Sequence, residues 1–87
     1  MSMTFNVQVS ADAEKHLQEI FHHIRFKYGS TETAARTVDG LETALQSLKM
    51  FPLRGRVYLT KYRAINYKRF TIVYEVDGQT VTIIAIH

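Results

Sequence analysis

The fold is decided by residues 70–87, which read FTIVYEVDGQTVTIIAIH. Two runs rich in β-branched and aromatic residues, 70–76 and 79–87, flank the dipeptide Asp77-Gly78, and such a dipeptide between strand-like runs is a strong signal for a two-residue hairpin turn. We therefore predict two antiparallel strands that are joined at this turn. The cross-strand pairs that follow are Val76 with Gln79, Tyr74 with Val81, and Ile72 with Ile83.

The two faces of this hairpin are predicted to differ in polarity, because successive side chains of a strand point to opposite faces. One face is almost entirely apolar: Phe70, Ile72, Tyr74, Val76, Val81, Ile83, Ala85 and His87. The other face is mixed: Thr71, Val73, Glu75, Thr80, Thr82, Ile84 and Ile86. We expect the apolar face to carry helices, the mixed face to be open, and Tyr74 to be a core residue.

Two helices are predicted upstream. Ser10 is the expected N-cap of the first helix and Gly29 its left-handed C-cap. Its buried stripe is Ala13, Leu17, Ile20, Phe21 and Ile24.

Ser30 is expected to open the second helix, and Pro52 to stop it after Phe51. A 4-3-4-3 spacing of apolar residues predicts that this helix packs antiparallel to the first. We interpret Gly40 as a place where the two helices approach closely. The stripe is Ala34, Val38, Leu41, Leu45 and Leu48.

The remaining segments are predicted to be strands and connections. Phe5, Val7 and Val9 alternate with polar residues, which is typical of a strand with one buried face. Residues 62–67 form another candidate strand, and a short one is expected near 57–59. The predicted fold class is α+β in the order β-α-α-β-β-β, with two antiparallel helices on one face of a small, mostly antiparallel sheet, and we expect residues 1–87 to form one domain.

Composition limits the classes of function. The 87 residues contain no cysteine, which excludes disulfides and thiolate metal sites. No apolar run is long enough for a membrane span, so we expect a cytoplasmic protein. Residues 1–48 carry four Lys or Arg against six Asp or Glu, whereas residues 49–87 carry seven against two. This asymmetry indicates a polyanionic target or an acidic protein partner, and the alternative is a solvated basic surface.

Cations alternate with aromatic rings in the basic half. The segment contains Arg54, Arg56, Tyr58, Lys61, Tyr62, Arg63, Tyr67, Lys68 and Arg69. Cations bind phosphates and rings can stack on bases, so RNA binding is physically reasonable. For Tyr62 and Tyr67 we favour the simpler interpretation, namely half-buried strand residues.

The order of these features resembles the RelE/ParE superfamily of toxins from type II toxin–antitoxin modules. The matching pieces are the strand of residues 5–9 followed by Ser10-Ala11-Asp12-Ala13, then Leu17, Ile20, Ile24 and Tyr28-Gly29, then Leu48 to Gly55, Tyr62-Arg63, Ile72 to Val76, and Val81 to His87. The resemblance covers nearly the whole chain. It implies the predicted fold and a cognate antitoxin as partner.

The resemblance also implies one of two activities. RelE-like members cleave mRNA in the ribosome, whereas ParE-like members are similar in fold and inhibit DNA gyrase. Ribonuclease members usually carry arginine where Thr71 stands, and loss of a fixed cation costs RNA cleavage on the order of 100- to 1000-fold. The 13-residue span from Tyr62 to Tyr74 is similar to ParE-type spacing. Family members commonly continue beyond the histidine that matches His87.

We therefore expect a toxin of the plasmid-stabilisation type that inhibits DNA gyrase without catalysis and is neutralised by an antitoxin. The alternatives are a ribosome-dependent mRNA endonuclease and an inactive antitoxin-binding relic, and a homo-oligomer is left open. The residues expected to bind the target or antitoxin are Arg54, Arg56, Lys61, Arg63, Lys68 and Arg69. For a ribonuclease the candidates are Arg63, Arg69 and His87.

We expect no cofactor and no metal. His16, Glu19 and His23 lie at i, i+3 and i+7 of the first helix, which could hold a metal only weakly. We interpret them as a solvated helix face. Arg63 is the preferred single site residue, because its planar guanidinium suits phosphate or carboxylate; the alternative is a surface ion pair with Glu75.

Overall fold

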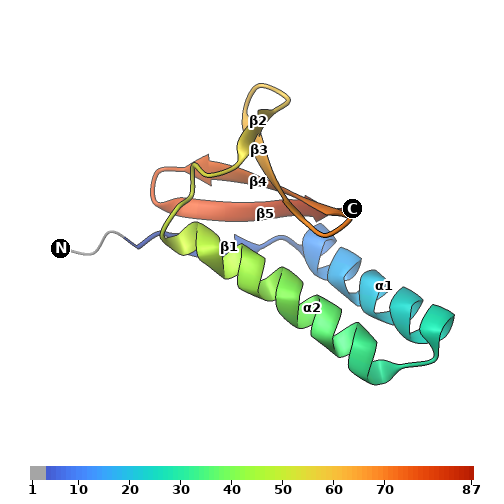
Figure 1. The fold of residues 1–87 in the computed structure, drawn as a ribbon. Coiled ribbons are helices and arrows are strands. Elements are labelled where there is room, and N and C mark those ends of the chain that lie inside the picture. Colours follow the sequence, from blue (N-terminus) through green and yellow to red (C-terminus); the bar gives the residue numbers. More distant parts are fainter. Residues whose placement is uncertain (1–3) are drawn as a thin grey trace.

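The computed structural model describes residues 4–87 and contains two helices and one five-stranded sheet (Figure 1). The elements are β1 (Asn6–Val9), α1 (Ala11–Tyr28), α2 (Thr31–Gln46), the 3-10 turn η1 (Ser47–Lys49), β2 (Arg56–Tyr58), β3 (Tyr62–Tyr67), β4 (Phe70–Asp77) and β5 (Thr80–Ile86). The strand order is β1-β5-β4-β3-β2, in which β1 is parallel to β5 and the other neighbours are antiparallel. Both helices lie on one face of the sheet, which confirms the predicted fold class. Neither helix in this part of the chain has the length and apolar character that a membrane span requires.

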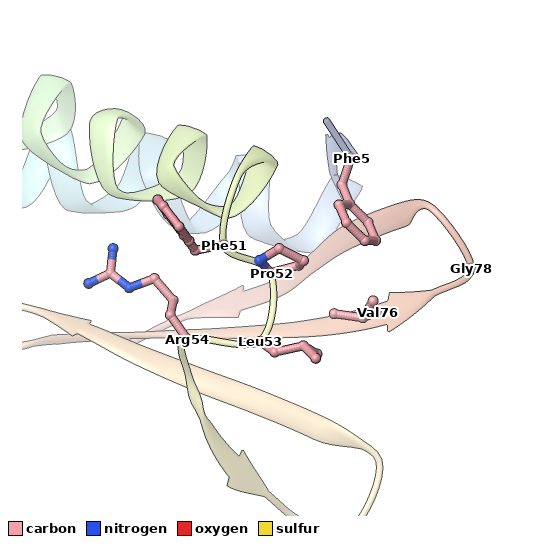
Figure 2. A pocket seen from close by; sticks show the side chains of 7 residues that line it. All are labelled: Phe5, Phe51, Pro52, Leu53, Arg54, Val76 and Gly78. Carbon is pink, nitrogen blue, oxygen red and sulfur yellow. The ribbon is translucent and has the colours of Figure 1, made fainter. Parts of the chain in front are cut away.

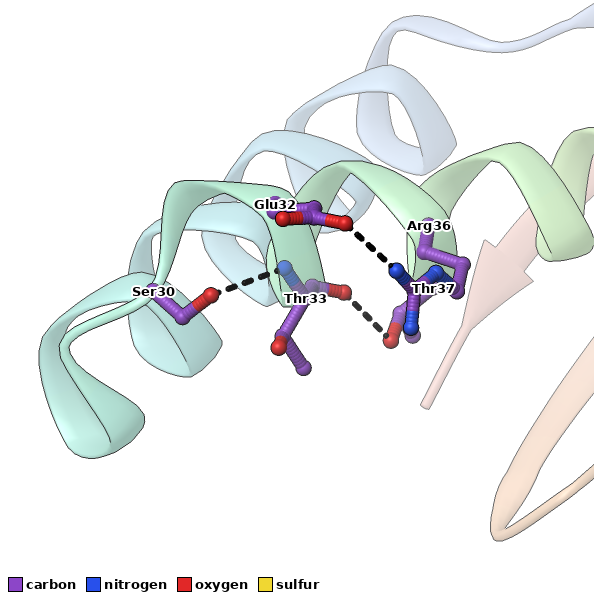
Figure 3. A network of polar contacts seen from close by, with 5 residues as sticks. All are labelled: Ser30, Glu32, Thr33, Arg36 and Thr37. Carbon is purple, nitrogen blue, oxygen red and sulfur yellow. Dashed lines mark hydrogen bonds and ion pairs between the residues drawn. The ribbon is translucent and has the colours of Figure 1, made fainter.

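The helix boundaries follow from capping residues. The Ser10 hydroxyl oxygen accepts a hydrogen bond from the Ala13 N–H at 3.1 Å, and Gly29 ends α1 with φ of 64°. At the start of α2 the Ser30 hydroxyl oxygen accepts from the Thr33 N–H, also at 3.1 Å (Figure 3). These three predicted caps are confirmed.

The C-terminal end of α2 differs from the prediction, which placed it at Phe51. The α-helix ends at Gln46, and the chain continues as the 3-10 turn. The N–H groups of Met50 and Phe51 both donate to the carbonyl of Ser47, at 3.4 and 3.2 Å. Two donors that share one carbonyl tighten the last turn of α2 into a 3-10 turn. The α-helix therefore ends upstream of Pro52.

The core lies between the helices and the sheet. Its buried members are Ala13, Leu17, Leu41, Leu45, Leu48, Ile65, Ile72, Tyr74, Val81, Ile83 and Ile86. Gly40 has a different role from the predicted one, because a Cβ atom at this position would collide with the hydroxyl of Tyr67. The glycine therefore makes room for a tyrosine ring of β3.

The β4–β5 hairpin turns one residue later than predicted. Asp77 pairs with Thr80, and Gly78 has φ of 60° at the first of the two loop positions, which is the pattern of a type II′ turn. The predicted pairs were therefore wrong. The observed pairs are Val76 with Val81, Tyr74 with Ile83, and Ile72 with Ile86.

A β-bulge then reverses the faces at the end of β5. The register shifts between Val73 and Tyr74, so that Ile84 is an extra residue on β5. As a result Ile86 joins the core with 2% exposure, in contrast to its predicted place on the open face. His87 exchanges both backbone hydrogen bonds with Thr71 and therefore lies on the open face. The prediction had placed His87 on the apolar face.

The bulge makes a prediction about stability. Replacement of Ile86 by alanine leaves a cavity in the core, and we expect it to lower the free energy of unfolding by about 2–4 kcal/mol. The half-buried Ile84 is the matched control, and Ile84→Ala should cost clearly less. Urea denaturation of both variants measures the difference. Equal losses would contradict the bulged register, because a regular hairpin places both side chains on the same open face.

Candidate partner-binding surface

The loop of residues 52–55 is held in place by one buried hydroxyl. Tyr74 of β4 has no exposed surface, and its hydroxyl donates to the Pro52 carbonyl at 2.7 Å. The same oxygen accepts the Gly55 N–H at 3.0 Å. Burial raises the pKa of the Tyr74 phenol, an effect that the Gly55 hydrogen bond partly offsets, so the hydroxyl stays protonated and able to donate at neutral pH.

Gly55 is required by the close approach of this hydroxyl. A Cβ atom here would lie 2.5 Å from the Tyr74 oxygen and 2.8 Å from the carbonyl oxygen of Ala64. The segment from Pro52 to Gly55 therefore needs its glycine for packing, since the segment closes around the tyrosine. We predicted Tyr74 as a core residue but missed its polar role; the available signal was a tyrosine where phenylalanine would fill the core, because a buried phenol needs partners.

Arg63 holds the same loop from β3. Its Nη1 donates to the Gly55 carbonyl at 2.8 Å and to the Leu53 carbonyl at 3.4 Å. The alternative interpretation, an ion pair of Arg63 with Glu75, is wrong. The Oε2 atom of Glu75 lies 3.6 Å from the Nζ atom of Lys61 instead. Arg63 is half-buried and shapes the surface from behind the loop.

The fixed loop borders an apolar groove of about 750 Å³ (Figure 2). Of the side chains that line the groove, Phe51 is 66% exposed and Leu53 is 62% exposed. Phe5, which precedes β1, and Val76 of β4 complete the apolar lining. Arg54 lies at one side of the groove, where its Nη1 donates to the Ser47 hydroxyl at 2.7 Å. The groove thus combines apolar side chains with a fixed cation.

Further exposed apolar side chains lie beyond the groove, on the β2–β3 hairpin. Val57 is 65% exposed and pairs with Arg63, so it faces the helix side of the sheet. Leu59 is 70% exposed in the hairpin loop, with a positive φ of 50°. Gathered exposed apolar residues are a usual mark of a protein-binding surface.

The structure separates the six predicted binding cations into three groups. Arg54 belongs to the loop that borders the groove, and Arg63 contacts this loop from β3. Arg56 and Lys61 lie on or beside the open face, where Arg56 donates to the Asn66 side chain at 3.3 Å and Lys61 pairs with Glu75.

The third group, Lys68 and Arg69, forms the β3–β4 turn at the opposite end of β3. The six residues of β3 span roughly 17 Å at the usual rise per residue, so this turn is remote from the β2–β3 hairpin. The predicted cations therefore do not form one continuous patch.

Two of the residues proposed for a ribonuclease, Arg63 and His87, are not brought together. Arg63 pairs with Tyr74 and His87 pairs with Thr71, and these two β4 partners are three residues apart. Positions three apart on a strand face opposite sides, so Arg63 and His87 lie on opposite faces. Arg69 lies in the β3–β4 turn.

The remaining predicted features have simpler surroundings. Tyr62 and Tyr67 are half-buried strand residues, as expected. On α1, the Nδ1 of His16 accepts the Ile86 N–H at 3.1 Å, which ties the helix to the end of β5. Within residues 4–87, no three His, Asp or Glu side chains lie close enough together to hold a metal ion.

The exposed apolar groove, with Arg54 at its side and Arg63 behind the loop that borders it, is the candidate binding surface. A family model described as the ParE toxin of the type II toxin–antitoxin system, parDE, matches residues 7–87. The chain therefore belongs to the ParE toxin family.

Two solved structures are similar to this chain. The chromosomal ParDE toxin–antitoxin system from P. aeruginosa has a TM-score of 0.85 and 20% identity, and the match covers 98% of this chain and 96% of that one. The toxin–antitoxin complex RelBE2 from Mycobacterium tuberculosis has a TM-score of 0.65 and 19% identity, with 95% of each chain covered. A search of curated proteins finds no match. At these identities the two structures show the fold alone.

The buried hydroxyl makes a second prediction. The substitution Tyr74→Phe leaves the Pro52 carbonyl and the Gly55 N–H without their partner, and we expect the free energy of unfolding to fall by about 1–3 kcal/mol. Tyr28→Phe removes the same atom from an exposed ring and should change the free energy of unfolding by less than about 0.5 kcal/mol. Denaturant unfolding of both variants is the measurement. Equally small effects would show that the Tyr74 hydrogen bonds do not hold the loop.

Proposed function

We propose that this ParE-family toxin arrests growth in the cytoplasm by inhibiting DNA gyrase, without catalysis of its own, and that a cognate antitoxin neutralises it. The observation that carries the proposal is the family match over residues 7–87, together with the surroundings of the open sheet face. There, Thr71 occupies the position where ribonuclease relatives carry arginine, and its backbone partner is His87.

The chemistry of RNA cleavage argues against the ribonuclease alternative. Attack by a 2′-hydroxyl needs a base, an acid and a cation on the phosphorane, all within reach of one phosphate. His87 could supply or accept a proton, but Arg63 faces the other side of the sheet and is hydrogen bonded to the loop. A partner-binding toxin needs no such assembly, so the arrangement supports the gyrase proposal.

The groove suits an antitoxin segment of amphipathic character. Its apolar wall, formed by Phe51, Leu53 and Val76, would bury apolar side chains of the segment. Arg54 beside the groove would receive a carboxylate, and a flexible antitoxin segment that folds on binding could follow the whole groove. We therefore propose that the antitoxin binds in the groove through apolar and acidic side chains.

The gyrase proposal is tested by supercoiling assays with purified gyrase and increasing amounts of the protein. We expect inhibition with accumulation of cleaved DNA. Arg63→Ala should weaken the inhibition roughly tenfold or more, because it removes the guanidinium that holds the loop beside the groove through the Gly55 and Leu53 carbonyls. Arg36→Ala removes the same charge from the exposed surface of α2, outside the predicted binding residues, and is the matched control, with an expected change below about twofold.

Absence of any effect on gyrase at a large excess would contradict the proposal. Cleavage of mRNA at fixed codon positions during translation with the purified protein would then establish the ribosome-dependent alternative. Normal growth on expression without antitoxin, combined with antitoxin binding, would instead identify an inactive relic.

A further inference from the structure

A second pocket lies at the end of the molecule away from the groove. It has a volume of about 380 Å³ and is enclosed by the last turns of α1, the first turns of α2 and the β3–β4 turn. It shares no lining residue with the groove of Phe51 and Leu53. No step of the proposed gyrase inhibition uses it, so its lining needs an explanation of its own.

The pocket carries uncompensated positive charge. Lys27 enters from α1, and Lys68 and Arg69 enter from the turn. None of the described residues that line it is acidic. Two ion pairs are found in residues 4–87, and neither involves these cations. Lys61 pairs with Glu75, and the Nη2 atom of Arg36 lies 2.7 Å from the Oε1 atom of Glu32 (Figure 3). The three cations are therefore free to bind an anion.

The pocket also has an aromatic and apolar wall. Tyr28 is 55% exposed, the half-buried Phe70 lies beside the basic turn, and the buried Ile24 closes the wall from α1. The ammonium group of Lys27 lies 5.5 Å from the centroid of the Tyr28 ring, which places a cation next to a stacking surface. From α2, Thr33 adds a hydroxyl to the lining.

The turn that supplies two of the cations has an unusual backbone. Lys68 has φ of 54°, a conformation that glycine and asparagine adopt more readily than lysine. A lysine at such a position is unfavourable for stability, and residues held in sparsely populated conformations concentrate at functional sites. The turn thus holds Lys68 in a conformation that a lysine does not favour.

We propose that this pocket binds one nucleotide unit, with its phosphate held by Lys27, Lys68 and Arg69 and its base against the rings of Tyr28 and Phe70. A simple anion would use the cations and leave the rings without a role. An acidic peptide likewise presents carboxylates but no flat ring. Cations with exposed rings are the combination that nucleotides engage, and the volume lies in the usual range of small-ligand pockets, roughly 300–1,000 Å³.

The test is an amide chemical-shift titration of the isotope-labelled protein with deoxyadenosine monophosphate, inorganic phosphate and a single-stranded DNA decamer. We expect saturable shifts at Lys68, Arg69 and Thr33 with the mononucleotide, and clearly weaker binding of phosphate. The decamer separates the two sources of such a ligand. Tighter binding of the decamer assigns a nucleotide within a strand, and equal binding assigns a free nucleotide.

Three variants localise the binding. Lys68→Gly combined with Arg69→Ala keeps a residue suited to the positive φ and should raise the Kd for the mononucleotide roughly tenfold or more. Tyr28→Ala should weaken mononucleotide binding and leave phosphate binding unchanged. The matched control is Arg56→Ala with Lys61→Ala, which removes two charges outside the pocket.

The proposal is overturned if millimolar mononucleotide gives no saturable shift, or if the control pair of substitutions weakens mononucleotide binding as much as the pocket variants do. It is also overturned if phosphate binds as tightly as the mononucleotide and Tyr28→Ala has no effect. Equal affinity of the protein for an aspartate-rich peptide and for the mononucleotide would overturn it as well. All binding is measured on the isolated toxin, so it does not depend on gyrase inhibition. Failure of one proposal is therefore distinguishable from failure of the other.

Discussion

The structure depends on a tyrosine hydroxyl that has two backbone partners in the interior. Tyr74 lies in the central strand β4, and its hydroxyl connects that strand to the carbonyl of Pro52 and the N–H of Gly55. The polar backbone groups of a loop lack the partners that a helix or sheet provides, and leaving such groups buried and unpaired is costly. The hydroxyl meets this need and fixes where the chain passes from the helices to the sheet.

The apolar groove follows from this constraint. With Pro52 and Gly55 held inward, the side chains of Phe51 and Leu53 remain at the surface and border the groove (Figure 2). Arg63 donates to the carbonyls of the same loop from β3, so a cation is fixed next to apolar side chains. Rigid positioning of such groups reduces the entropy lost when a partner binds.

Periodicity and capping residues were sufficient to predict the elements and the fold class, because both act locally. The hairpin register was not predictable in this way. A glycine after Asp77 is compatible with two turn types that differ by one residue, and the bulge that sends Ile86 into the core has no signal in the alternation of the strand. The site was predicted only in part, since charge patterning found the cations but could not show that the topology separates Arg63 from Arg69.

The most direct test of the account is hydrogen exchange at the Gly55 amide. This amide belongs to a loop, yet the Tyr74 hydroxyl accepts its hydrogen in a buried position at 3.0 Å. The account predicts that it exchanges as slowly as the amides of the central strand β4, and that Tyr74→Phe makes its exchange much faster. Exchange in the unmodified protein as fast as that of an unstructured peptide would contradict the claim that Tyr74 fixes the loop and, with it, one side of the groove.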